Sequence, residues 1–357
     1  MILDIYMILL SVVILSAVVL RGTRKKNTIY VIFVTVLLFS VLALRGIRVG
    51  ADLGRYETHY EMCYSLAWSE LFKKYPNNIL FYVLMKLQSE IFGYDFHGLI
   101  FLLAVFEGII VGKMILKYSV NPYMSFLIYI SMGYYAFNFS GLKQSLAMSL
   151  IMLAYDACIS NKLGKFIVTV FLASIIHLPS IIFLPAYYLG HRRLNVNMIL
   201  FYILFAGTIS MARGNLVEYM TDIYGAVVSN SVLGGVGGKV VMMLVFIVGG
   251  FFLRIPDGEN HEYSATFHFM ILATILQTFA TYGNVFERLA DYYFIFSIFY
   301  IPFIFENTKF RKGSTRTLIN YNNQIYVFLN LVILIFSIIY FDMTIHETYG
   351  MYPYYLN

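Results

Sequence analysis

The sequence carries little charge: only 12% of its 357 residues are Asp, Glu, Lys or Arg, about half the share of a soluble domain. Its hydrophobic content of 60% and mean hydropathy of +0.75 point the same way. Apolar runs long enough to cross a bilayer recur from one end to the other. We therefore predict an all-α polytopic membrane protein, a single integral membrane domain over residues 1–357 with no separate soluble domain.

Several kinds of chemistry are excluded by what is missing. No HExxH, GxSxG, P-loop or zinc spacing occurs, and no pair of carboxylates suits a divalent metal. We expect no cofactor and metal-independent chemistry. The only two cysteines, Cys63 and Cys158, are expected on opposite membrane faces, where they cannot pair. The net charge of +6 lies in short loops between spans, so we expect no nucleic-acid partner.

The apolar runs predict about twelve transmembrane helices. They lie near residues 2–20, 28–44, 98–116, 123–139, 143–160, 164–177, 179–190, 197–212, 239–253, 264–282, 289–305 and 323–341. The first lacks the basic flank and cleavage pattern of a signal peptide, so we expect it to be retained. Placing most basic loops in the cytoplasm puts both termini outside.

That arrangement makes residues 45–97 an extracytoplasmic loop, in which 78–92 is a helix lying at the membrane interface. The alternative lets 78–92 cross the membrane, but it moves later basic loops outside. Residues 213–238 are predicted to be a second extracytoplasmic loop, rich in glycine, that serves as a lid or is disordered.

Polar side chains gather on the outer face in this topology, which opposes the positive-inside trend. They are Arg45, Arg48, Asp52, Arg55, Glu57, His59, Lys143, Gln144, His177, Arg213, Arg288 and Asp291. Cations from distant segments suit a bound anion, because arginine grips phosphate oxygens with two parallel hydrogen bonds. Plainer interpretations stay open: an arginine can snorkel to water, Arg288 can pair internally with Asp291, and His177 can be a packed core residue.

Four motifs in order resemble the EpsG/Wzy family of bacterial polysaccharide polymerases. They are "ALRGIRVGADLGRY", "YYAFNFSGLKQSLAMSLIMLA", "LASIIHLPSIIFLPAYYL" and "NVFERLADYYFIFSIFYIP", and the chain closes on a similar "YPYY". The residues that match are Arg45, Gly50, Asp52, Tyr56, Gln144, His177, Arg288 and Tyr292. Lys143 stands where the family usually has arginine, so the charge is kept and the two-pronged grip is lost.

The resemblance implies a membrane fold similar to the GT-C glycosyltransferases. It implies joining of undecaprenyl-pyrophosphate-linked oligosaccharide repeats at the outer face of the bacterial cytoplasmic membrane, with a chain-length regulator and a flippase as partners. By this analogy Asp52, His177 and Arg288 are the catalytic residues, and Asp52 and His177 are both candidates for the base. The predicted substrate- and pyrophosphate-binding residues are Arg45, Arg48, Arg55, Lys143, Gln144, Arg213, Tyr56 and Tyr292, of which Arg48, Arg55 and Arg213 are chosen by chemistry alone.

Two other functions stay open at this point. A flippase or transporter for the same lipid-linked units suits twelve spans, but it needs charge along a central pathway and the sequence shows no internal repeat. A membrane O-acyltransferase also uses a histidine in an apolar stretch, but its acyl donor arrives from the cytoplasm, whereas His177 is expected outside. The sugars, the linkage and its stereochemistry do not follow from the sequence.

Overall fold

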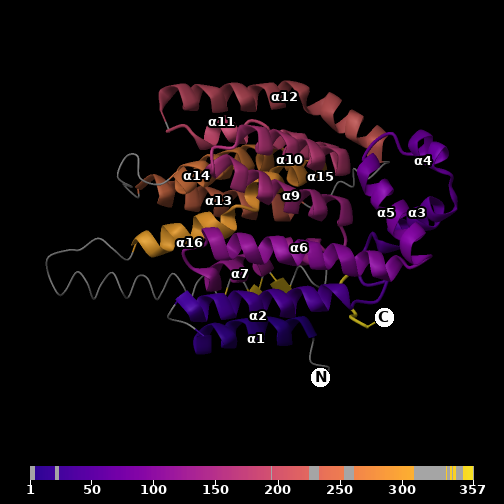
Figure 1. The fold of residues 1–357 in the computed structure, drawn as a ribbon. Coiled ribbons are helices and arrows are strands. Elements are labelled where there is room, and N and C mark those ends of the chain that lie inside the picture. Colours follow the sequence, from indigo (N-terminus) through magenta and orange to yellow (C-terminus); the bar gives the residue numbers. More distant parts are fainter. Residues whose placement is uncertain are drawn as a thin grey trace.

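The chain folds into a bundle of α-helices (Figure 1) in the computed structural model, which describes residues 5–20, 24–193, 195–224, 233–252, 261–308, 335, 338–339, 341–342 and 349–356. The predicted span 323–341 lies almost entirely outside these residues. Within them no strand forms, and a single antiparallel bridge joins Arg45 to Leu356. The all-helical prediction is confirmed for the described part of the chain.

Most helices coincide with the predicted apolar runs. They are α1 Ile5–Leu20, α2 Arg24–Ala43, α3 Leu53–Ser65, α4 Trp68–Lys74, α5 Ile79–Phe92, α6 Phe96–Tyr118, α7 Pro122–Ser131, α8 Tyr134–Phe137, α9 Leu142–Ile159, α10 Leu163–Ile176, η1 Leu178–Phe183, α11 Ala186–Gly190, α12 Val196–Tyr224, α13 Leu233–Phe252, α14 His261–Thr278, η2 Phe279–Tyr282, α15 Asn284–Phe294 and α16 Ser297–Thr308.

Several of these helices are long and apolar enough to span a membrane. By length and composition five described helices qualify, and the pair α15–α16, bent by 49°, makes a sixth. Shorter apolar helices account for the predicted runs at 2–20, 164–177, 179–190 and 239–253. The structure is therefore that of an integral membrane protein with several spans, and the number twelve stays a prediction.

Two predicted boundaries are wrong. The run 123–139 is not one helix, because Gly133 adopts a left-handed conformation (φ 81°) between α7 and α8. The predicted glycine-rich loop 213–238 is largely helical where it is described, since α12 continues to Tyr224 and α13 begins at Leu233. A helix pairs its interior backbone N–H and C=O groups within the segment. A lipid environment demands such pairing, and this offsets the low helix propensity of glycine.

Helices α3, α4 and α5 cap one end of the bundle, at the right of Figure 1. Helix α5 is the predicted interfacial helix, and its polarity is inverted: Lys86 and Gln88 are buried, whereas Leu87, Ile91 and Phe92 are exposed. An exposed apolar face fits lipid surroundings better than water. Its 14 residues extend about 21 Å, short of a hydrocarbon core of about 30 Å, and its interfacial placement stays a prediction.

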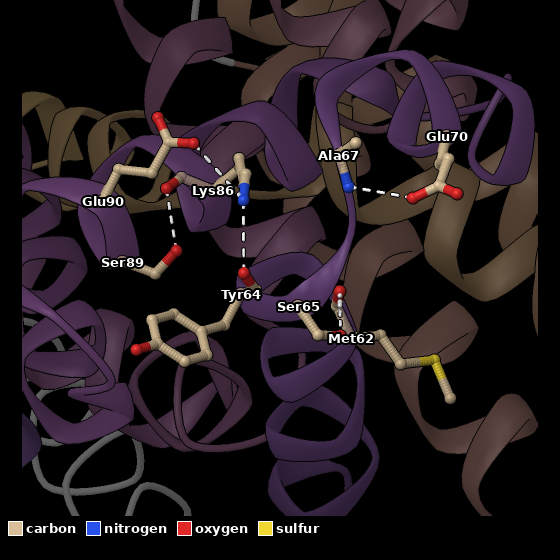
Figure 2. Close-up of polar contacts among 8 residues, drawn as sticks. All are labelled: Met62, Tyr64, Ser65, Ala67, Glu70, Lys86, Ser89 and Glu90. Atoms are coloured by element: carbon tan, nitrogen blue, oxygen red, sulfur yellow. Dashed lines mark hydrogen bonds and ion pairs between the residues drawn. The ribbon is translucent and has the colours of Figure 1, made fainter.

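Lys86 fastens α5 to the end of α3 (Figure 2). Its Nζ donates to the carbonyl oxygen of Tyr64 in the last turn of α3 at 3.2 Å and pairs with Glu90 at 3.3 Å. A cation at a helix C-terminus satisfies a carbonyl that has no partner within the helix and complements the helix dipole. Because α3 carries residues of the site described below, this contact fixes the site's outer wall.

Replacing Lys86 with methionine is expected to destabilise the protein by about 1–3 kcal/mol, because the Tyr64 carbonyl at the end of α3 loses the charged donor that the buried Lys86 supplies. The measurement is thermal unfolding in detergent. Lys73→Met is the matched control, since Lys73 is exposed on α4. Equal melting temperatures for the two variants would contradict this role of Lys86.

The opposite end of the bundle carries its own charge cluster. Asp156, near the end of α9, lies between Lys165 at 3.6 Å and Lys117, to which it is also hydrogen-bonded. Cys63 and Cys158 are both free and buried.

Candidate active site

A cavity of about 440 Å³ lies where α3, α4 and α5 meet the ends of α9, α10 and α15. Its volume is typical of small-ligand sites. Its lining comes from segments far apart in the sequence. The lining residues are Asp52, Arg55, Tyr56, His59, Lys74, Tyr75, Pro76, Asn77, Asn78, Tyr82, Phe137, Gly141, Lys143, Gln144, His177 and Arg288.

Seven of the eleven predicted site residues line this one cavity. They are Asp52, Arg55, Tyr56, Lys143, Gln144, His177 and Arg288. The structure thus brings charged residues of distant segments together at one end of the bundle.

Asp52 is positioned by the loop between α8 and α9. It immediately precedes α3, and the Ser140 hydroxyl lies 3.3 Å from both its Oδ2 and its backbone nitrogen. Arg55 and Tyr56, one turn later, face the same cavity. Burial and the charge of Asp52 raise the pKa of Tyr56 to about 12, so its hydroxyl stays protonated at neutral pH.

Lys143, in the first turn of α9, lies among tyrosines. Its Nζ donates to the Tyr82 hydroxyl at 3.3 Å and sits 5.7 Å and 5.3 Å from the ring centroids of Tyr56 and Tyr82. Cation–π contacts of this kind hold an ammonium group in place while leaving its charge intact. The lysine that replaces the expected arginine is therefore fixed by aromatic packing.

His177 lies where α10 ends. Its backbone is extended, and the following Leu178-Pro179 cannot continue the α-helix, so the imidazole sits at the helix end against the cavity. Its Nδ1 is 2.5 Å from the hydroxyl of Tyr292, which lies behind it rather than in the lining. Asn78 Oδ1 accepts a hydrogen bond from the Leu178 amide and fixes the same turn.

Arg288 enters from α15 and is joined to α9. The amide of Gln144 donates to the Arg288 carbonyl oxygen at 3.1 Å. The alternative of an internal Arg288–Asp291 ion pair is not supported, since none forms between these two described residues. The side chain of Arg288 is instead part of the cavity wall.

Four predicted binding residues do not line the cavity. The expectation for Arg45 requires correction: it is buried at 1% exposure, its guanidinium donates to the Asn138 carbonyl oxygen at 3.0 Å, and it covers the Phe139 ring at 4.8 Å. Arg45 therefore joins two loops beneath the site.

Arg48 is exposed on a turn, and Arg213 is exposed on α12 over the ring of Tyr282. The fourth is Tyr292, the partner of His177.

Sequence reasoning missed the contribution of the end of α4 and of the loop that joins it to α5. Lys74, Tyr75 and Asn78 line the cavity, and Asn78 takes a left-handed conformation (φ 58°) just before α5. The run "KKYPNN" carries the proline and asparagine signals of a turn. Tyr82 was missed because its tyrosine looks like part of an aromatic belt.

The cavity lining is strongly positive. Arg55, Lys74, Lys143 and Arg288 face it, and Asp52 is the single carboxylate among the lining residues. Among the described residues no group of three or more His, Cys, Asp or Glu side chains could hold a metal ion. This arrangement is suited to an anion held by side-chain cations.

His59, in the cavity wall, should make the stability of the folded protein depend on pH. Burial, followed by the charges of Lys143, Arg55 and Lys74, lowers the pKa of His59. The unfolded chain then binds this proton more readily, so stability should fall as pH drops from about 6.5 toward the lowered pKa of the folded state. Melting curves between pH 7.5 and pH 5 measure it. In His59→Gln the decline should be shallower, and parallel declines would contradict the assignment.

Comparison with protein families gives a match that covers residues 5–356 and so nearly the whole chain. The chain belongs to the EpsG family. Membership of the EpsG family indicates a role in polysaccharide biosynthesis, as a polymerase-like membrane protein. Comparisons with curated proteins and with solved structures give no significant match.

Proposed function

We propose that this EpsG-family protein is a Wzy-type polysaccharide polymerase, a membrane glycosyltransferase that joins oligosaccharide repeats carried on undecaprenyl pyrophosphate. The observation that carries the proposal is the cavity in which four cations and one carboxylate meet at the end of an apolar helix bundle. Its fold would be of the GT-C kind. Its partners would be the lipid-linked oligosaccharides, membrane lipid, a chain-length regulator and a flippase.

The reaction needs a site that stabilises a departing diphosphate. An acceptor hydroxyl forms a bond to the anomeric carbon of the donor, and the bond from that carbon to the diphosphate oxygen breaks. Negative charge grows on the diphosphate, which leaves on its prenyl carrier. Lys143, Arg288 and Arg55 supply preorganised positive charge there, and such stabilisation is commonly the largest contribution to catalysis.

The acceptor proton goes to Asp52 or to His177, the two candidate bases that line the cavity. Asp52 has a carboxylate that Ser140 orients. His177 acts as a base through Nε2 when its Nδ1 carries the proton and donates to Tyr292, and as a hydrogen-bond donor in the other tautomer. The pH–rate profiles of Asp52→Asn and His177→Gln distinguish the two, because the variant that lacks the base loses the acidic limb.

The cavity would face the outside of a bacterial cytoplasmic membrane. The basic residues Lys117 and Lys165 at the opposite end of the bundle favour the cytoplasm for that end. Cysteines placed singly at Asn77, on the cavity rim, and at the exposed Lys165 test this orientation. A membrane-impermeant thiol reagent added to intact cells should label only the first, and labelling of position 165 alone would reverse the orientation.

The function itself is tested by giving purified protein lipid-linked repeat units in detergent. A ladder of longer glycans on the carrier is expected. In vesicles, movement of the units across the bilayer without bond formation would instead indicate a flippase, and an acylated product an O-acyltransferase. The cavity favours the polymerase because its charges lie at one end of the bundle and not along a central pathway.

A further inference from the structure

The segment Tyr349–Leu356 pairs with the loop that leads into Asp52. The Gly46 amide donates to the Tyr355 carbonyl at 2.8 Å, Gly50 to Gly350 at 2.9 Å, and Ala51 to Tyr349 at 2.9 Å. The pairs run in opposite directions along the two segments, and the bridge between Arg45 and Leu356 continues the same register. Residues separated by three hundred positions therefore form one antiparallel ribbon.

The ribbon is anchored to the first two helices. The Tyr6 hydroxyl of α1 donates to the carbonyl of Met351, which is fully buried, at 2.8 Å. The Tyr354 hydroxyl donates to the Val41 carbonyl near the end of α2 at 3.1 Å. The Tyr6 and Tyr354 rings also meet edge to face at 5.7 Å. The segment is thus packed into the protein at several points.

The same segment reaches two parts of the cavity wall. The Tyr349 carbonyl accepts a hydrogen bond from the Ala51 amide, and Ala51 directly precedes the lining residue Asp52. The ring of Tyr349 packs edge to face against Phe137, another lining residue, at 5.7 Å. The Asp52 side chain does not cap its own helix α3, so its position depends on Ser140 and on the backbone before it.

We infer that Tyr349–Leu356 is a positioning element of the active site, which holds Asp52 at the geometry required for glycosyl transfer. The inference deepens the proposed function and rests on it for its catalytic half. It adds residues that touch no substrate and act through Asp52. It also places this segment on the same membrane face as the cavity.

Two glycines give a matched pair of variants. Both Gly350 (φ 62°) and Gly93 (φ 78°) have left-handed backbones, so alanine is strained at either position. A Cβ at Gly350 would lie 2.9 Å from the Ala51 nitrogen, whereas a Cβ at Gly93 meets nothing within 4 Å. Both substitutions therefore carry the same kind of conformational cost. Only Gly350→Ala also brings a Cβ against the backbone of Ala51.

Hydrogen exchange measures the structural half of the inference. In Gly350→Ala, peptides covering residues 45–56 should exchange about tenfold faster than in the wild type, because the amides of Gly50 and Ala51 lose their acceptors. In Gly93→Ala these peptides should keep the wild-type rate. Unchanged exchange in Gly350→Ala would overturn the inference, whether or not the wild type makes polymer.

Polymer synthesis measures the catalytic half. Gly350→Ala should lower kcat about tenfold or more with little change in KM, since Lys143 on α9 and Arg288 on α15 stay in place and still bind the diphosphate. In an Asp52→Asn background the same change should cause no further loss, because its effect passes through Asp52. Full additivity of the two losses would overturn the positioning role. A wild-type protein without a ladder would overturn the proposed function, and the exchange result would still decide where the segment acts.

Discussion

Arg288→Gln is expected to slow polymer formation about 10²- to 10³-fold, the usual loss when one preorganised group that stabilises developing charge is removed. The Arg288 side chain lines the cavity with Lys143 and Arg55, and its backbone carbonyl is held by Gln144. Glutamine keeps a polar side chain that can donate hydrogen bonds, although a shorter one, and removes the charge. The loss should appear in kcat, because negative charge grows on the diphosphate as the bond breaks.

The matched control for this prediction is Arg48→Gln. Arg48 is exposed on the turn before Asp52 and does not line the cavity. It should keep nearly wild-type rates, measured from ladder formation on lipid-linked repeats with equal amounts of monodisperse protein. If the two variants lose activity equally, the charge of the cavity has no special role and the mechanism is wrong.

Gly50→Ala is expected to abolish activity and to destabilise the protein by about 3 kcal/mol or more, since it combines backbone strain with overpacking. Gly50 has φ 135°, and an added Cβ would lie 1.9 Å from the Phe139 carbonyl oxygen. That neighbour is backbone and cannot rotate away. Moving it would displace Ser140, which contacts Asp52, and weaken the hydrogen bond from Gly50 to Gly350.

Gly54→Ala is the control for this variant. Gly54 lies in the first turn of α3 and a Cβ there meets nothing within 4 Å, so alanine should be neutral or stabilise the helix slightly. Thermal unfolding and ladder formation are compared for both variants. A Gly50→Ala protein that melts and polymerises like Gly54→Ala would show that the approach of the two loops is unimportant.

The sequence alone predicts the helices and much of the cavity, because each carries a local signal. Apolar runs define the helices, and charges at their ends are conspicuous in so apolar a chain. Lys143, His177 and Arg288 are predicted from such signals, and all three line the cavity.

The role of Arg45 was not predictable in the same way. In sequence, an arginine that binds phosphate and one that donates to a buried carbonyl look identical. The difference lies in Asn138 and Phe139, which are distant in the chain and are brought to Arg45 by the packing of two loops. The wall formed by Lys74 and Tyr82 was missed for a related reason, since a surface lysine and a belt tyrosine are common in membrane proteins.

The ribbon between residues 45–51 and 349–356 was also beyond sequence reasoning. A tail rich in tyrosine suits the membrane interface, and aromatic belts explain such tails without any tertiary contact. Here Tyr354 and the main chain around it are bound to the loop before α3. Long-range backbone pairing leaves no local pattern, and only the folded structure reveals it.

The most direct test of the account is the binding of undecaprenyl pyrophosphate, without sugars, to purified protein in detergent. We expect the wild type to bind it with an affinity that falls as salt rises, because the contact is between charges. The variant Lys143→Gln/Arg288→Gln should bind it at least about 10²-fold more weakly, a loss of about 3 kcal/mol. The variant Arg48→Gln/Arg213→Gln, which removes two exposed cations outside the cavity, should bind it as the wild type does. Equal affinity in all three proteins would contradict the claim that this cavity holds the diphosphate.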